Sequence, residues 1–224
     1  PPGWAPPHHP AEVRTQEDAR LLVDGYDGSL AYVDHWIGRI LNVLAEKGVL
    51  DDTAVIVSGD HGDSFGEHGQ YMDHGIANVA VHNIPMVMRW PDMAGRGTSD
   101  ALVYNLDLCP TTCELLDLPI PEEWDGKSFA AAVKGEEFAG RPYLVYDHGI
   151  YTYSRAVRTA DWTLIAMYHP GLYRYDSPFY LHDLAADPGQ QFNLYPERRD
   201  KFNELAGYMT ELRLEQVRKG GAPD

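Results

Sequence analysis

The chain has 224 residues, a length that allows one good hydrophobic core and a second small one. Its 34 acidic and 18 basic residues give a formal net charge of -16, which argues against a nucleic-acid backbone or an anionic membrane surface as partner. No apolar run approaches the roughly 20 residues of a membrane-spanning helix. If the substrate is an anion, the site must supply its own positive charge, and a metal ion is the obvious source.

Residues 1–14 are predicted to form an extended lead-in, because prolines are frequent in residues 1–10. His8 and His9 lie there, and adjacent histidines in a proline-rich arm are more typical of a linker than of a metal site. The sequence opens on Pro1 without an initiator methionine, so it is interpreted as a fragment or processed piece. The compartment is therefore left open, with a periplasmic or secreted protein among the alternatives.

A long amphipathic helix is predicted to begin at Thr15, which provides a capping hydroxyl followed by two acids, and to end at Gly48. Gly25 and Gly28 each cost about 1 kcal/mol inside a helix, so a bend or close packing is expected there. The apolar stripe consists of Leu22, Tyr26, Leu30, Val33, Ile37, Ile40, Leu41 and Leu44.

A β-branched run over Thr53–Ser58 predicts a buried strand, and Ile84–Trp90 predicts a second one. A long helix that enters a strand through a short turn is the αβ unit of a doubly wound sheet. Asp60 and His61 follow the first strand directly. Ligands bind outside the carboxyl ends of strands in such sheets, so the polar loop between the two strands is the predicted site.

The next segment is expected to form a strand over Thr98–Asn105 and then a helix over Leu108–Leu116 that is capped by Asp107. Cys109 and Cys113 both fall on this helix, which makes a disulfide framework implausible. Cys109 is predicted to be a packed helix residue, since a free cysteine behaves as a small hydrophobic side chain.

Beyond a soft boundary near residue 120, the spacing of short β-rich runs predicts an antiparallel meander. A last helix is expected to open at Pro196-Glu197 and to cover one side of that sheet through Phe202, Leu205, Met209 and Leu212. The expected strands are Tyr143–Tyr146, Ser154–Arg158, Trp162–Met167 and Phe179–Asp183.

Several motifs in a fixed order, between about residues 31 and 194, resemble the C-terminal part of a sulfatase of the alkaline-phosphatase superfamily. Each motif alone is weak, whereas their order and spacing together are specific. They are Asp60-His61-Gly62, Phe65-Gly66-Glu67-His68-Gly69, Asp73-His74, Ile84–Pro91, Leu106–Thr112, Tyr180–Leu184, Asp187-Pro188-Gly189 and Asn193-Leu194.

The resemblance implies an α/β fold: residues 1–120 form part of an alkaline-phosphatase-like sheet with helices, and residues 121–224 form a small α+β subdomain with an antiparallel sheet and a terminal helix. It also implies hydrolysis of a sulfuric ester, with a sulfated small molecule or glycan as the partner. In the family, the N-terminal half supplies a formylglycine nucleophile, its arginine and two further metal-binding aspartates. Cys109 is not followed by that arginine, so it is not expected to be the nucleophile. Without the N-terminal half, we expect this chain alone to be inactive.

The metal ligands implied by the resemblance are Asp60 and His61, for a divalent cation that acts as Lewis acid and template. An aspartate that caps its own turn is the alternative for Asp60. A carboxylate suits a hard cation such as calcium, which the resemblance favours. Imidazole is more usual for zinc or manganese, so these metals stay open.

His74 is predicted to donate a proton or to contact the sulfate, with a structural hydrogen bond as the alternative. Asp73 stands where the family commonly has a lysine, so it either faces a substrate hydroxyl or marks a different substrate. His82 is expected at the substrate rim or on the surface, and His68 is expected to be structural or to support the ligands.

The C-terminal segment of sulfatases often borders the pocket, which makes Arg155 a candidate substrate contact beside Arg158 and His148. Strand alternation puts Arg155 and Arg158 on opposite faces, so only one of them can face a site.

Two other functions remain open at this point. One is a phosphodiesterase or phosphonate hydrolase of the same superfamily, in which Asp-His pairs bind transition metals. The other is a non-catalytic binding protein on that fold, for which Asp73 is the only support. Fold-level analogy cannot choose between them.

Overall fold

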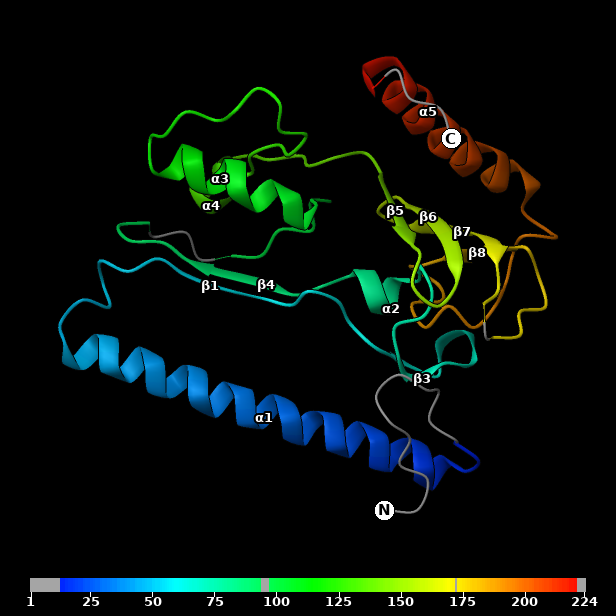
Figure 1. Cartoon of the computed structure of the whole chain (residues 1–224), viewed down its shortest axis with the longest axis horizontal. Helices are drawn as coiled ribbons and strands as arrows, with labels where there is room; N and C mark the ends of the chain where they lie inside the picture. Colours follow the sequence, from blue (N-terminus) through cyan, green and yellow to red (C-terminus); the bar gives the residue numbers. More distant parts are fainter. Residues whose placement is uncertain (1–12, 94–96, 172, 221–224) are drawn as a thin grey trace. The chain divides into compact units, whose positions relative to one another are not determined.

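The computed structural model describes residues 13–93, 97–171 and 173–220 (Figure 1). Their contacts divide them into two compact units. Unit 1 comprises residues 13–75 and 79–93, and unit 2 comprises residues 76–78 together with the described residues beyond 96. The domain boundary that the sequence places near residue 120 stays a prediction. Among the described residues, no helix combines the length and apolar character that crossing a membrane requires.

Helix α1 (Gln16–Glu46) is capped by Thr15, as predicted, and the cap is a full capping box. The Asp18 N–H donates to Thr15 Oγ1 at 3.1 Å, and the Thr15 N–H donates to the Asp18 carboxylate at 2.9 Å. The helix runs as one element through Gly25 and Gly28. A Cβ added at either glycine would meet nothing within 4 Å in the described chain, so the predicted close packing is not found there.

The two predicted strands of unit 1 are present as β1 (Val55–Ser58) and β4 (Met86–Arg89), which pair antiparallel. The predicted burial is wrong for the described chain, because neither strand contains a buried residue. Arg89 lies opposite Val55 and donates to Asp51 at 2.6 Å, which ties the end of this ribbon to the turn before β1. The segment between the strands contains a short antiparallel pair, β2 (Ser64–Phe65) and β3 (Tyr71–Asp73), the turn η1 (Glu67–Gly69), and α2 (Val79–His82).

Beyond residue 97, unit 2 has irregular chain where a strand was predicted. Residues 98–105 make only one isolated bridge, between Leu102 and Arg141. The turn η2 (Asn105–Asp107) then leads into α3 (Leu108–Leu115), and α4 (Ala130–Val133) follows. Cys109 is exposed and not packed, which corrects the prediction, and both cysteines are free thiols.

Asp107 precedes α3, but its side chain does not cap the helix. The carboxylate is fully buried and accepts the N–H groups of Tyr104 and Lys127, each at 2.7 Å. It also forms a bidentate pair with the Arg141 guanidinium. A buried carboxylate needs a full set of donors, and this need outweighs one bond to the helix terminus.

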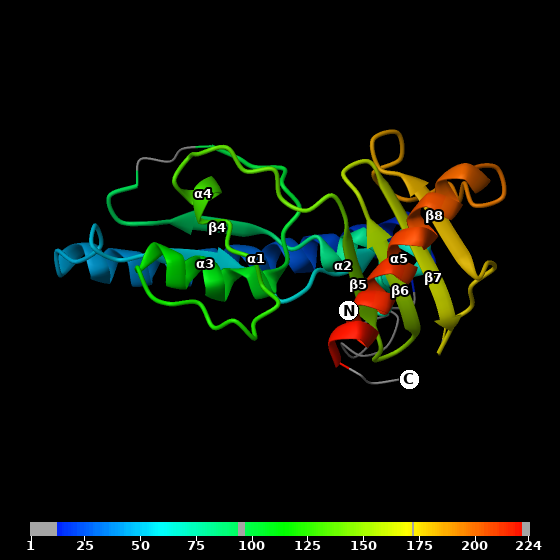
Figure 2. The same ribbon diagram turned by 90° about the horizontal axis from the view of Figure 1, so that it is seen from above.

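The predicted meander is confirmed as one antiparallel sheet in the order β5-β6-β7-β8 (Figure 2). The register places Leu144 opposite Arg158 and Leu164 opposite Leu181. The strands are β5 (Leu144–His148), β6 (Tyr153–Arg158), β7 (Trp162–His169) and β8 (Phe179–Asp183).

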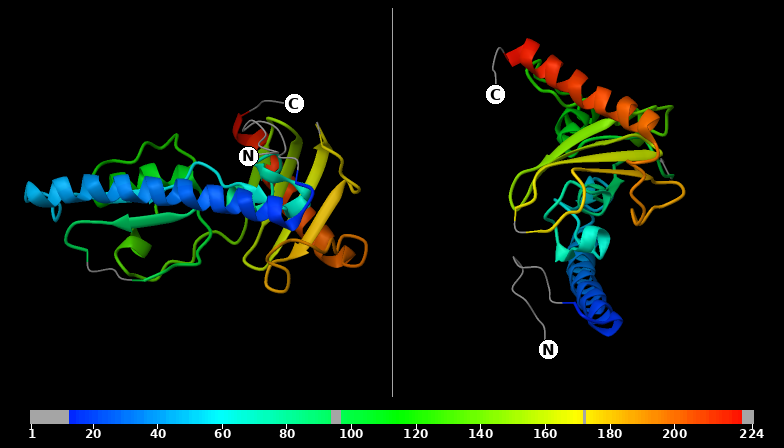
Figure 3. Two further views of the ribbon diagram at one scale, coloured as in Figure 1. Left: turned by 90° about the horizontal axis from the view of Figure 1, so that it is seen from below. Right: turned by 90° about the vertical axis from the view of Figure 1, so that its right-hand side faces the viewer.

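Helix α5 (Arg199–Gly220) lies along one face of this sheet (Figure 3) and begins slightly later than predicted. Its predicted apolar face is confirmed, because all four residues join the core on that side. The buried members of this core are Val145, Val157, Leu164, Ala166, Leu181, Leu205 and Met209. The other face of the sheet packs a smaller cluster of Ile76, Ala77, Ala156, Ile165 and Tyr180.

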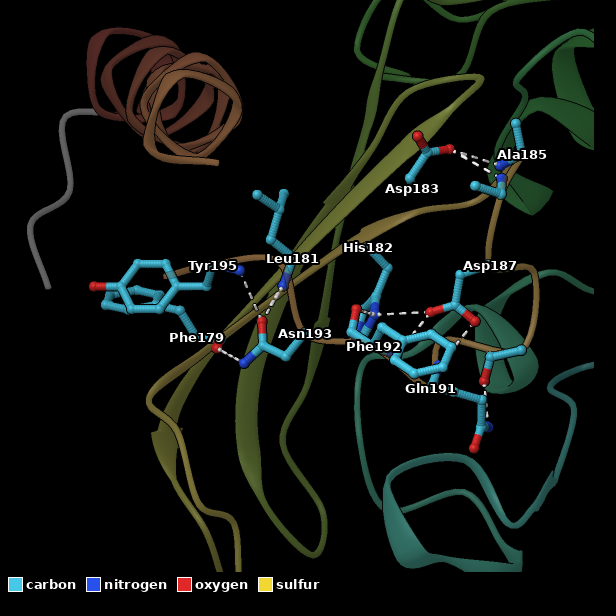
Figure 4. A network of polar contacts seen from close by, with 12 residues as sticks. Phe179, Leu181, His182, Asp183, Ala185, Asp187, Gln191, Phe192, Asn193 and Tyr195 are labelled. Carbon is cyan, nitrogen blue, oxygen red and sulfur yellow. Dashed lines mark hydrogen bonds and ion pairs between the residues drawn. The ribbon is translucent and has the colours of Figure 1, made fainter. Parts of the chain in front are cut away.

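The chain after β8 is held to the sheet by Asn193 (Figure 4). Its Oδ1 accepts the N–H groups of Leu181 and Tyr195, at 3.0 and 3.1 Å, and its Nδ2 donates to the Phe179 carbonyl at 2.9 Å. One amide side chain thus substitutes for a neighbouring strand at this edge.

A second anchor joins His182, in β8, to the turn that follows. His182 Nδ1 lies 2.9 Å from the Phe192 carbonyl and 3.7 Å from the Asp187 carboxylate. Asp187 accepts the N–H groups of Gln191 and Phe192 at 3.0 and 2.8 Å. Burial lowers the pKa of His182 below its ordinary 6.5, although Phe192 and Asp187 oppose that shift.

This anchor predicts a pH dependence of stability. Folded His182 binds a proton less readily than the unfolded chain does, so the free energy of unfolding should fall as the pH drops below about 6.5. Urea unfolding between about pH 7.5 and 5.5 should show this loss, and His182→Gln should flatten it. The pKa of Asp187 lies below its usual 3.8, because its hydrogen bonds outweigh burial, so its titration falls outside this window. An equal slope in both proteins would contradict the assignment.

Candidate active site

Close backbone packing at Gly62 fixes the loop that follows β1. The Gly62 N–H donates to the Val81 carbonyl, in α2, at 2.8 Å. A Cβ at Gly62 would stand 2.1 Å from the Ala80 carbonyl oxygen, so only glycine fits here without a backbone shift. The polar residues on either side of Gly62 therefore project from a fixed point of unit 1.

Asp60 has a highly exposed side chain, with a relative accessibility of 92%. Its Oδ1 accepts the N–H of His61 at 3.0 Å, which is the turn-capping arrangement considered for it. This hydrogen bond, the N–H of Asp60 itself and the His61 imidazole lower the pKa of the carboxyl. Oδ2 lies 4.0 Å from His61 Nε2, so the cap still leaves one oxygen on the side of the imidazole.

Three potential metal ligands gather beside Asp60. One ligand atom from each of His61, Asp63 and His74 lies within 4.8 Å of the other two. Asp63 Oδ1 is 3.4 Å from His74 Nδ1, and the rings of His61 and His74 lie 4.1 Å apart between centroids. Asp60 is not a member of this group.

Asp63 is the residue of this group that sequence reasoning missed. The signal was present, because Asp60, His61 and Asp63 are three potential ligands within four positions around a glycine turn. What the sequence cannot give is the direction in which β3 returns. That direction places His74, eleven residues later, against Asp63.

Asp73 and His74 are adjacent at the end of β3 but occupy different environments. Asp73 is buried, and its Oδ1 accepts the N–H of His74 at 2.7 Å. His74 is half-buried. His68, in η1, and His82, at the end of α2, are also half-buried. The predicted substrate contacts of Asp73, His74 and His82 stay predictions.

Arg155 belongs to unit 2, in β6, where Asp147 of β5 lies directly opposite. The guanidinium forms a bidentate pair with this carboxylate, at 2.6 and 2.9 Å, and this hydrogen bonding raises the pKa of Arg155. Much of its charge is therefore neutralised within the sheet. Arg158 and His148 lie on the same two strands, with His148 buried opposite Ser154.

The glycine constraint can be tested with a matched pair of variants. Gly62→Ala should destabilise the chain by about 1–3 kcal/mol, because the added methyl overlaps the Ala80 carbonyl. Gly59→Ala is the control, since a Cβ there meets its nearest atom at an ordinary 3.5 Å. Urea unfolding measures both, and equal effects of the two substitutions would rule out the proposed crowding.

Comparisons with known proteins agree with the order of motifs. A family model described as Sulfatase matches residues 1–118, and one described as N-sulphoglucosamine sulphohydrolase, C-terminal, matches residues 66–220. An N-acetylglucosamine-6-O-sulfatase of Bacteroides thetaiotaomicron is 27% identical over 89% of this chain and 36% of its own length. A choline-sulfatase of Rhizobium meliloti is 28% identical over 80% of this chain and 34% of its own.

Solved structures share the fold. A protein in complex with its substrate D-glucosamine-2-N,6-O-disulfate superimposes with a TM-score of 0.72 at 26% identity, over 85% of this chain and 40% of its own. A phosphonate monoester hydrolase from Silicibacter pomeroyi gives 0.75 at 23% identity, over 92% of this chain and 43% of its own. This chain thus spans well under half the length of these proteins. With two family models that each match more than half of it, the chain belongs to the sulfatase family.

Proposed function

We propose that this chain is the C-terminal part of a sulfuric ester hydrolase. The observation that carries the proposal is the gathering of His61, Asp63 and His74 beside Asp60 at the end of β1, in a chain of the sulfatase family. A sulfated carbohydrate is the proposed substrate class. Relatives named N-acetylglucosamine-6-O-sulfatase and Delta 4,5-hexuronate-2-O-sulfatase, both from Bacteroides thetaiotaomicron, support this choice.

Sulfatases generally use a divalent metal, and the residues at the end of β1 fit one. Asp60 offers an exposed oxygen, and the contact of His61 Nδ1 with the Gly62 carbonyl, at 3.0 Å, leaves Nε2 as the second ligand atom. A bound cation would supply positive charge to a transferred sulfuryl group. Calcium is the proposed metal because carboxylate oxygen suits it, with zinc or manganese as alternatives because of the imidazole.

His74 is the proposed proton donor or sulfate contact. Its backbone is fixed by the Asp73 carboxylate at 2.7 Å, and its Nδ1 faces Asp63. A carboxylate at Nδ1 accepts the proton of that nitrogen and holds the imidazole in one orientation. Nε2 is then the ring nitrogen through which a proton would pass to a leaving oxygen. Asp73, His82 and Arg155 remain proposed substrate residues. Asp73 supplies no cation where the family commonly has a lysine.

The proposed partner of this chain is the N-terminal half of the same sulfatase, with its formylglycine nucleophile, arginine and two further aspartates. Helix α1 supports this proposal, because none of its residues is buried in the described chain. Apolar surface of this extent is stabilised by a covering protein at about 25 cal/mol per Å². Its exposed apolar side chains are Leu21, Val23, Leu30, Tyr32, Val33, Trp36, Ile40 and Val43.

A direct test uses the complete protein that carries this chain together with an N-terminal half. It should release sulfate from an aryl sulfate, and Asp60→Asn should lower the rate by roughly 100–1000-fold, because a weakened cation would stabilise the charge of the transition state less well. Asp52→Asn, at another exposed aspartate of unit 1, is the control and should leave the rate unchanged. Turnover of an aryl phosphodiester without sulfate release would favour the phosphonate-hydrolase alternative, and binding without any turnover would favour a non-catalytic protein.

The partner surface can be tested separately. Trp36→Asp should lower the free energy of unfolding of this chain by no more than about 1 kcal/mol, because the ring is partly exposed and its contacts with Tyr32, His35 and Arg39 lie within α1, but should weaken co-purification with a co-expressed N-terminal half. Ala31→Asp, at an exposed position on the polar side of α1, is the control and should still co-purify with the N-terminal half. We expect no aryl sulfate turnover by the chain alone. Turnover by the isolated chain would overturn this proposal. Equal co-purification of Trp36→Asp and Ala31→Asp with the N-terminal half would also overturn it.

A further inference from the structure

Buried side chains hold the backbone on both sides of His74, and we infer from their placement that Gln70 is a positioning residue for His74. Gln70 touches no substrate in this role. It fixes the direction in which His74 presents its imidazole. The inference rests on the proposed function for its effect on turnover, whereas the fixed geometry can be measured in this chain without any activity.

His74 differs in burial from the residues that follow it. Among residues 73–78, all of which the structure describes, every residue except His74 is buried. The His74 side chain is 20% accessible. Only two side-chain torsions separate an imidazole from its backbone, so the backbone of His74 largely decides where the ring points.

Both peptide planes beside His74 are held by a side-chain acceptor. The His74 N–H, in the plane before its Cα, donates to Asp73 Oδ1 at 2.7 Å. The Gly75 N–H, in the plane after it, donates to Gln70 Oε1 at 3.2 Å. Because peptide groups are planar, holding both N–H groups restricts φ and ψ of His74 together. The Gln70 contact restricts ψ, where the following glycine gives the chain little restraint of its own.

Gln70 can serve as this acceptor because its own position is fixed. Its carbonyl accepts the Gly66 N–H at 2.7 Å, and its N–H donates to the Glu67 carbonyl at 3.1 Å. The side chain is 1% accessible and Gly75 is also buried, so water does not compete for the bond between them. The Gly75 N–H therefore meets an amide oxygen of defined position.

The contact between Gln70 and Gly75 requires the chain to turn back on itself. Five residues of extended strand would separate them by roughly 16 Å, which a glutamine side chain cannot span. Met72 lies between them with a φ of 49°, a left-handed conformation that is unfavourable for a residue with a side chain. Such a conformation persists where its surroundings hold it, and the bond from Gly75 to Gln70 is one such restraint.

A purely structural role is the alternative for Gln70, because loss of any buried hydrogen bond destabilises a protein. Thr111, in α3, offers a matched comparison. It is fully buried, and its Oγ1 accepts the Phe129 N–H at 2.9 Å. Thr111→Val therefore removes a buried acceptor of a backbone N–H without touching residues 73–78.

A double-mutant cycle in the complete protein tests whether Gln70 acts through His74. Gln70→Met keeps the length of the side chain but removes the acceptor, and it should lower kcat/KM for an aryl sulfate roughly 10–100-fold, because His74 is then misplaced. In a His74→Ala background, the same substitution should change kcat/KM by less than about threefold. Thr111→Val should stay within about threefold in both backgrounds. Gln70→Glu keeps an acceptor oxygen and should lose less activity than Gln70→Met.

NMR spectra of the 224-residue chain test the geometry without any activity. In the unmodified chain, the Gly75 amide proton should show nuclear Overhauser contacts to the γ-protons of Gln70. Gln70→Met should speed hydrogen exchange of the Gly75 amide by at least about tenfold, and should split or broaden the His74 ring signals. Thr111→Val should leave both unchanged, and His74→Ala identifies the ring signals. A complete protein that releases no sulfate would end the proposed function and leave these results standing.

Any of four results would overturn the inference. Equal losses from Gln70→Met with and without His74 would show that Gln70 does not act through His74. Equal losses from Gln70→Met and Thr111→Val would leave Gln70 a purely structural role. Unchanged exchange of the Gly75 amide in Gln70→Met would show that the bond does not hold this peptide. Missing contacts between Gly75 and Gln70 in the unmodified chain would show the same, even if Gln70→Met does not fold.

Discussion

The close approach of Gly62 to α2 is the constraint on which the site depends. A Cβ at that position would lie 2.1 Å from the Ala80 carbonyl, and the Gly62 N–H is already committed to Val81. The backbone on either side of Gly62 is therefore restricted to one conformation, which sets the directions of the His61 and Asp63 side chains. Polar side chains on an exposed loop would otherwise lose their order to conformational entropy, so a fixed backbone is what makes ligand geometry available before any ion binds.

Carboxylates also fix the backbone elsewhere in the molecule, although the chain is already strongly acidic. Asp107 holds three segments of unit 2 together through two N–H groups and a guanidinium, and Asp187 closes the turn after β8. Asp73 holds the backbone of His74. Part of the net charge of -16 is therefore structural, because these acids satisfy buried or turn N–H groups that no regular ladder reaches.

Elements with strong periodicity could be predicted from sequence, and contacts between distant residues could not. The stripe of α1, the four strands of the meander and the α5 face follow from spacing alone. Residues 98–105 have strand-like composition but no ladder partner beyond one bridge, and Asp107 meets Arg141 only through the fold. Only part of the cluster at the end of β1 could likewise be predicted from sequence. Asp60 and His61 carried a family motif, whereas Asp63 became a candidate only through its distance from His74.

The residues on the two sides of His61 differ in what they can offer a cation. Asp60 presents an exposed oxygen whose other ligands would have to come from outside this chain, which suits a calcium ion that gathers six to eight oxygens. Asp63 and His74 present a half-buried oxygen and nitrogen that lie 3.4 Å apart and pair with each other. An N-terminal half that brings further carboxylates would complete a site on Asp60 and His61, whereas Asp63 and His74 already contact each other within this chain. The proposed metal ligands are therefore the part of this cluster that depends most on assembly with an N-terminal half.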